Sequence, residues 1–259
     1  MSASGIAGLL VGIACLLASP AAQAQAPAAK AATAAPGQAL SALERQGCEA
    51  LRAAPSSRLM AGRPSSDALL RLVSEQTDPQ LLRRQLQGQD LDRTRGSQGL
   101  TLLDLAAGVG NHAAVRVLLD LGARLPSKSA SGDSALDHAI LQGQAATACL
   151  LMQQGALLSD ARQKPYLLPA ALLTERAAHA DWLTGALLAR GFDANAAMNG
   201  DPALLIAAEL GHEGALRRLL QAGADPRRSN ARGESLQQVA ARGGHEALLR
   251  RVLAANPSQ

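Results

Sequence analysis

Aromatic residues are almost absent from this sequence: its 259 residues include one Trp, one Tyr and one Phe. The apolar residues are mainly Ala, Leu and Val, and such small side chains suit closely packed helices better than a wide β-sandwich. A platform for stacking bases needs aromatic rings. The net charge of +4 is mild, with no basic stripe to follow a phosphate backbone. The composition therefore predicts a mostly helical protein that does not bind nucleic acid.

Motifs for catalysis or metal binding are also missing. The sequence has no P-loop, no catalytic triad and no zinc-type spacing of Cys and His. The run 108–113 (GVGNHA) superficially matches a dinucleotide fingerprint, but we place it between two helices and not after a strand. Asp104 and Asp137 recur at one repeat position, where local capping or a solvated surface fits better than acid–base work or a cation site. We expect no enzyme, no cofactor and no metal.

Charged side chains are absent from residues 5–18, a run too short to span a bilayer. Ala22-Gln23-Ala24 follows, a small-x-small cleavage pattern, and we predict a signal peptide at 1–24 although no Lys or Arg precedes the run. Cys15 leaves a lipoprotein as the alternative, but Gly12 stands where a lipobox has Leu. The composition is typical of bacteria, so we expect a periplasmic or secreted protein with no stable membrane insertion after signal removal.

What the sequence does contain is a glycine pattern that repeats every 33 residues. Each copy has an opening Gly, a polar or turn-forming residue, a small or apolar pair, a second Gly and then a pair of large apolar residues. The opening glycines are Gly99, Gly132, Gly200 and Gly233, and the second glycines are Gly110, Gly143, Gly211 and Gly244. The small pair allows close helix approach, the second Gly ends the first helix, and the apolar pair buries the second helix. Each copy is therefore expected to be a helix-turn-helix unit.

These residues resemble the ankyrin family, whose pattern runs G-x-T-P-L-H-x-A-A-x-x-G-H…L-L…G-A-D. The segments 99–107, 206–212 and 219–225 match it closely. The resemblance implies a mostly α solenoid of about six helix-turn-helix repeats joined by β-hairpin-like loops, within a domain of 63–259. It also implies that His212 and His245, which follow the second Gly, bridge backbone groups at the helix turn. The Asn256-Pro257 pair is expected to end the array.

The segment before the array divides into an Ala/Pro linker at 25–37 and a short N-terminal helix with its connection at 38–62, the amphipathic helix being expected at 38–54. Cys48 and Cys149 are the two cysteines beyond the predicted signal peptide. They could pair in an oxidising compartment. The repeat pattern places them well apart, so we expect two separate thiols.

One repeat is irregular, because 68 residues separate Gly132 from Gly200 and all three aromatic residues fall between them. One interpretation is that larger side chains fill the volume of a longer helix pair. The alternative is that Tyr166 and Phe192, close to hairpins, line a surface for a partner, since aromatic residues are common interface hot spots. Trp182, on the second helix, is expected to pack inside.

The resemblance implies that hairpin tips and first helices bind another protein. We expect the residues around the opening glycines to contribute most. They are Ser97, Gln98, Leu100, Ser131, Asp133, Asn199, Asp201, Arg232 and Glu234. Arg227, Arg228 and Arg232 form a local basic cluster that meets an acidic partner or is simply a solvated hairpin.

We therefore expect a monomeric, non-catalytic binding module that scaffolds, stabilises or inhibits a partner of unknown identity. An immunity-type inhibitor of a toxic enzyme and an envelope stress-protection protein are the alternatives.

Overall fold

The computed structural model describes residues 40, 42–51, 68–75, 77–93, 99–125 and 132–255, all within the unit that spans 32–259. The predicted signal peptide, the Ala/Pro linker and most of the connection to the array lie outside these residues. Within the described part no helix has both the length and the apolar character needed to cross a bilayer.

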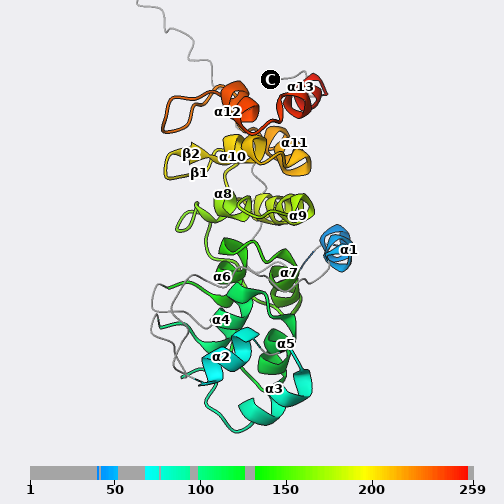
Figure 1. Ribbon diagram of the computed structural model, residues 1–259, viewed down its shortest axis with the longest axis vertical. Helices are drawn as coiled ribbons and strands as arrows, with labels where there is room; N and C mark the ends of the chain where they lie inside the picture. The colour runs from blue at the N-terminus through cyan, green and yellow to red at the C-terminus, as the bar shows by residue number, and fades with distance from the viewer. Residues whose placement is uncertain are drawn as a thin grey trace, which may run out of the picture. The chain divides into compact units, whose positions relative to one another are not determined.

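Six helix pairs follow one another along the array, as predicted. Each pair has a first and a second helix. They are α2 (Ala68–Glu75) and α3 (Pro79–Leu86), α4 (Leu102–Val109) and α5 (His112–Asp120), α6 (Ala135–Leu141) and α7 (Ala145–Gln153), α8 (Leu167–Ala171) and α9 (Ala177–Leu188), α10 (Ala203–Glu209) and α11 (Glu213–Gln221), and α12 (Leu236–Arg242) and α13 (Glu246–Ala254). First helices contact first helices and second helices contact second helices of neighbouring pairs, which produces the two columns in Figure 1.

The opening turns are fixed by local hydrogen bonds that the repeat pattern dictates. Thr101 caps α4 in a capping box with Asp104, and Ser134 caps α6 in the same way with Asp137. Before α10 the turn is a hairpin of β1 (Ala197–Met198) and β2 (Asp201–Pro202), in which Ala197 pairs with Pro202. Its two-residue loop is Asn199-Gly200, with φ of 54° and 84°, the backbone that a type I′ turn requires. Of the two expected roles of these aspartates, local capping is confirmed and a solvated surface is wrong, since both are buried.

The second glycine of each repeat ends a first helix and leaves room for the next repeat. Gly110 has φ of 76° at the end of α4, and Gly211 has φ of 70°. A Cβ on Gly143 would lie 2.7 Å from the Cβ of Thr174, well inside van der Waals contact. The predicted glycine stops are therefore present, and at Gly143 the close approach of the next repeat also requires one.

Side chains at the following position join one repeat to the one before it. The Asn111 amide donates to the carbonyl oxygen of Val73 over 2.8 Å. His212 Nε2 lies 3.0 Å from the carbonyl oxygens of both Leu172 and Thr174, so this nitrogen carries the proton that it donates. Burial lowers the pKa of His212, which keeps the ring neutral. The predicted bridging role of His212 is confirmed.

The core is aliphatic, and the irregular repeat adds the aromatic volume. Trp182 is buried, as expected. Of the two interpretations of Phe192, the filling of core volume is confirmed and a place on a binding surface is wrong: it is only 4% exposed and belongs to the core. Phe192 takes the place of the Ala in the Gly-Ala-Asp turn. Ala123 and Ala224 at that place are buried, and Ala156 is half-buried and packs against the core. The side chain at this place therefore turns toward the core in these repeats.

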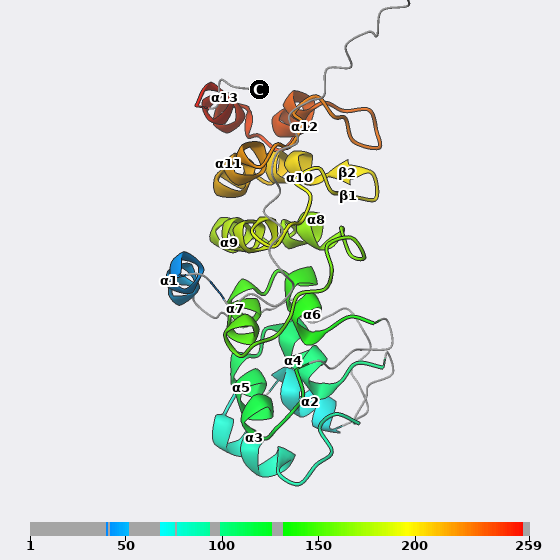
Figure 2. The same cartoon turned by 180° about the vertical axis from the view of Figure 1, so that it is seen from behind.

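An additional helix, α1 (Ala42–Ala50), lies against the second-helix column. It contacts α7 and α9, on the side away from the β1–β2 hairpin, as the opposite view in Figure 2 also shows. It is shorter than the predicted helix at 38–54. Cys48 of α1 forms a disulfide with Cys149 of α7, so the expectation of two separate thiols was wrong. The repeat period positions only the helices that belong to the array, and α1 does not.

Candidate protein-binding face

The candidate face consists of the opening turns and the first helices. Of the residues predicted to contribute, Ser97, Gln98 and Ser131 lie outside the described part. Leu100 and Asp133 were expected to be accessible, and this was wrong: they are 9% and 8% exposed. Both follow the opening Gly directly, and in these two repeats the side chain turns toward the array, whereas Asp201 and Glu234 at the equivalent place are half-buried.

Asp133 belongs to a polar cluster with Asp137 and Lys164, which holds the loop before α8 in place. Lys164 Nζ lies 2.5 Å from Asp133 Oδ1 and 2.9 Å from Asp137 Oδ2, and it also donates to the carbonyl oxygen of Gly132. The Ser159 hydroxyl donates to Asp137 Oδ2. Because Asp137 is completely buried, the ammonium group balances a carboxylate that water does not reach.

The charges of this cluster shift the pKa values of Lys164 and Tyr166. Burial alone would lower the pKa of Lys164, but its hydrogen bonds to the two aspartates outweigh burial and raise the pKa. The Tyr166 hydroxyl donates to Asp133 Oδ1 over 3.4 Å. Burial and the nearby Asp133 carboxylate raise the pKa of Tyr166. Tyr166 is half-buried, so part of the ring stays accessible, and its contact with a partner stays a prediction.

The predicted polar residues of the last two repeats remain at the surface. Asn199 is exposed, and Asp201 and Glu234 are half-buried. Glu234 Oε2 lies 2.6 Å from Arg242 Nη1 and 3.2 Å from Arg232 Nε. These ion pairs are partly exposed to solvent, so they contribute little to stability.

The predicted basic cluster does not form a single patch. Arg227 pairs with Asp225 over 3.3 Å, Arg228 donates to the carbonyl oxygen of Asn195 over 2.5 Å, and Arg232 pairs with Glu234. Two of the guanidinium groups thus pair with a carboxylate two residues away, and that of Arg228 reaches the backbone of the preceding repeat. Of the two alternatives, this favours the solvated hairpin.

The repeat pattern did not identify the apolar residues of the face. Leu173, just after α8, is 48% exposed, and Leu210, just after α10, is 41% exposed. The half-buried Leu141 is the last residue of α6. We call Leu141, Leu173 and Leu210 the end-of-helix leucines. Neighbouring first helices contact each other, so their axes are about 10 Å apart and the leucines belong to three adjacent units.

Polar groups stand next to these leucines. Gln142 follows Leu141 and is exposed. Glu209 precedes Leu210 and lies 3.0 Å from Arg242 of the next repeat. For Leu141 and Leu210 a signal was available, because they fall in the two variable positions between the small or apolar pair and the second Gly. Leu173 had no such signal, since its repeat lacks that glycine. An apolar centre with a polar rim is the usual anatomy of a protein interface.

No group of three or more His, Cys, Asp and Glu side chains among the described residues is arranged to hold a metal ion. Asp133, Asp137 and Lys164 are held together by mutual charge, with Lys164 Nζ donating to Asp133 Oδ1 and to Asp137 Oδ2. The arrangement at this face is suited to contact with another macromolecule.

Comparison with known proteins agrees with the repeat pattern. Family models described as ankyrin repeats match residues 69–161 (three copies) and 204–253 (many copies). No curated protein sequence matches the chain.

Among solved structures, the chain is similar to a chain of the complex between the predatory endopeptidase Bd0816 of Bdellovibrio bacteriovorus and the immunity protein Bd3460. The identity is 24% and the TM-score 0.53, covering 73% of this chain and 99% of that one. It is also similar to an ankyrin repeat domain (ABAYE2397) of Acinetobacter baumannii AYE, with 24% identity, a TM-score of 0.53, and coverage of 73% and 97%. These similarities concern the fold. The matched segments, the six stacked helix pairs and the glycine-ended first helices together identify the chain as an ankyrin-repeat protein.

Proposed function

We propose that this protein is a non-catalytic binding module that recognises a partner protein through the end-of-helix leucines and the polar residues around them. The observation that carries the proposal is the exposure of Leu173 and Leu210 at the ends of neighbouring first helices. These two large apolar side chains in adjacent units can form the apolar centre of an interface, from which water is excluded when a partner binds. The Glu209–Arg242 pair beside them provides charges for orientation and specificity.

The proposal includes export to the periplasm or beyond. The Cys48–Cys149 disulfide supports it, because disulfides form and persist in oxidising compartments and are rare in the cytosol. The apolar run at 5–18 and the Ala22-Gln23-Ala24 pattern agree with it. Fractionation of cells that produce the full chain tests it: we expect the protein outside the cytoplasm in a form shortened by about 24 residues, and a full-length cytosolic protein would contradict it.

The binding test uses variants that alter the surface but not the core. The double variant Leu173→Gln/Leu210→Gln replaces two exposed side chains, so its stability should change by no more than about 1 kcal/mol. Arg116→Gln is the matched control, since Arg116 is exposed on the second helix α5. Affinity purification after crosslinking in the native host should recover a defined partner with the control but not with the double variant. Recovery of the same partner at equal yield with both would contradict the proposed face.

A second candidate function is that of an immunity-type inhibitor. The similar chain from the complex of an endopeptidase with an immunity protein favours this possibility over a general scaffold. An inhibitor of this kind is expected to form a tight one-to-one complex with a toxic enzyme. If the recovered partner is an enzyme and the purified protein suppresses its activity at equimolar concentration, this candidate is supported, and a partner whose activity is unaffected would refute it.

A further inference from the structure

The second helices of the third and fourth pairs differ from the others in their charge. Every other second helix carries an exposed Arg, such as Arg83 on α3, Arg116 on α5 and Arg218 on α11. Helix α7 has no charged residue, and its side chains from Ala145 to Met152 are all buried. A helix that is apolar all round must be covered all round. Something therefore has to cover the outer side of α7, and α1 does so.

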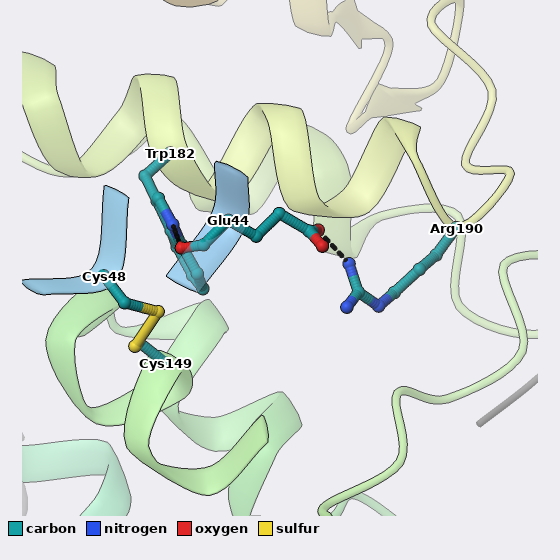
Figure 3. The surroundings of a disulfide bond; sticks show 5 residues. All are labelled: Glu44, Cys48, Cys149, Trp182 and Arg190. Atoms are coloured by element: carbon teal, nitrogen blue, oxygen red, sulfur yellow. Dashed lines mark hydrogen bonds and ion pairs between the residues drawn. A yellow bond between two sulfur atoms is a disulfide. The ribbon is translucent and has the colours of Figure 1, made fainter. Parts of the chain in front are cut away.

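The contacts of α1 are specific, and they come from both α7 and α9 (Figure 3). Cys48 and Cys149 are joined, with their Cα atoms 5.8 Å apart. Trp182 Nε1 donates to the carbonyl oxygen of Glu44 over 3.1 Å. The Glu44 carboxylate lies 2.6 Å from Arg190 Nη1, and these two side chains are only 17% and 15% exposed.

Gly47 allows α1 to approach this closely. A Cβ at this position would lie 2.8 Å from Cδ1 of Trp182, so any larger residue would push the helix off the indole ring. The Trp182 ring thus forms the floor of a site on the outer side of α7 and α9, which we call the outer-face site.

Helix α1 spans the irregular junction of the array. The third and fourth pairs are the ones between which the period is broken, and α8 of the fourth pair has only five residues. Since α1 contacts both α7 and α9, it braces the two pairs from the side opposite to the candidate binding face.

Helix α1 is too short to be stable by itself. It has nine residues, and isolated helices of fewer than about 12–15 residues are marginal in water. Its described residues are held in place by the disulfide, the Trp182 hydrogen bond and the Arg190 ion pair, among other contacts. The disulfide keeps the helix at a high local concentration beside its site.

We propose that the Cys48–Cys149 disulfide is a redox switch that holds α1 in place. Reduction by a dithiol releases α1 and exposes the apolar outer-face site at Trp182. A thiolate of the reductant attacks one sulfur and expels the other as a thiolate, and the second thiol of the reductant resolves the mixed disulfide. Two electrons pass to the protein, both cysteines end as protonated thiols, and the reductant leaves as a disulfide. Because Cys48 is 5% and Cys149 is 4% exposed, attack has to wait for α1 to lift, so reduction is slow.

The test uses Trp182 as the reporter, since it is the only Trp in the chain. The full chain carries Cys15→Ser, so that Cys48 and Cys149 are the only cysteines. Acrylamide quenching of Trp182 fluorescence is measured in the oxidised form, after dithiothreitol, and in the additional double variant Cys48→Ser/Cys149→Ser. We expect quenching to rise several-fold and emission to shift to the red in the last two samples, with the far-UV circular dichroism nearly unchanged and with full recovery on reoxidation.

Three results would overturn the proposal. Unchanged quenching after reduction would show that α1 stays docked without the disulfide. Loss of most of the circular dichroism would show that the bond holds the whole array together and does not release one helix. The variant Arg190→Gln in the oxidised form is the control for the ion pair. Its Trp182 should remain protected, and quenching as strong as in the reduced protein would assign the fastening to Arg190.

Discussion

Replacement of Lys164 by Met should destabilise the third and fourth repeats strongly. The variant keeps an unbranched side chain of similar length but removes the charge that lies between Asp133 and Asp137. Asp137 is completely buried, so its carboxylate is left without a counter-charge in a region from which water is excluded. Removing one partner of a buried ion pair costs about 3–5 kcal/mol, and we expect a loss of about 3 kcal/mol, since the Ser134 and Ser159 hydrogen bonds to Asp137 remain.

Urea unfolding provides the assay, followed by Trp182 fluorescence and by far-UV circular dichroism. Trp182 lies on α9, in the repeat that the Lys164 loop precedes. The triple variant Lys164→Met/Asp133→Asn/Asp137→Asn also removes the two carboxylate charges that Lys164→Met leaves without a counter-charge. It should recover at least half of the lost free energy of unfolding. A loss below about 1 kcal/mol for Lys164→Met, or a triple variant less stable than the single one, would refute the idea that the ammonium group compensates these carboxylates.

The same cluster predicts a pH effect. The folded-state pKa of Lys164 is raised, so its contribution is fully present below the ordinary lysine pKa of about 10.4 and is lost as the pH rises through the folded value. Wild type should therefore lose stability above about pH 10.4 more steeply than Lys164→Met, and parallel curves would contradict this.

Two further predictions concern the packing between repeats. Burial lowers the pKa of His112, His179 and His212. The stability that their neutral forms contribute is therefore present above about pH 6.5 and is lost as the pH falls through the folded-state pKa values. Urea unfolding should give a smaller free energy of unfolding at pH 5.5 than at pH 7.5, and equal values would contradict the prediction. Gly143→Ala should cost about 2–4 kcal/mol, because it combines a left-handed backbone with overpacking against Thr174. Gly88→Ala is the control, with φ of 78° and open space around it, and should cost about 1 kcal/mol; equal losses of melting temperature would show that the contact with Thr174 is unimportant.

The repeating part of the fold was predictable because each position in the period has one physical task. The glycines at 110, 143 and 211 end first helices, the residues at 101 and 134 cap them, and His212 bridges to the preceding repeat. The burial of Phe192 was also implied by this logic, since the equivalent Ala224 is buried. The aromatic character of Phe192 was compatible with an interface or with the filling of core volume, and its place in the repeat decides for the core.

The part outside the period was not predictable in the same way. Nothing in the spacing of Cys48 and Cys149 indicates that a chain of about a hundred residues returns α1 to α7. A weaker signal was present in the uncharged sequence of α7, which required a cover that the array itself does not supply. The salt bridges of Lys164 were equally hidden, because they depend on the conformation of the irregular loop before α8.

Site-specific photocrosslinking tests the binding face most directly. The photoreactive residue p-benzoylphenylalanine replaces Leu210 at the end of α10 in one variant and Arg116 on α5 in another, since both positions are exposed. After irradiation of cells of the native host, we expect one defined protein adduct from position 210 and none from position 116. An adduct from position 116 with none from position 210 would contradict recognition through the end-of-helix leucines.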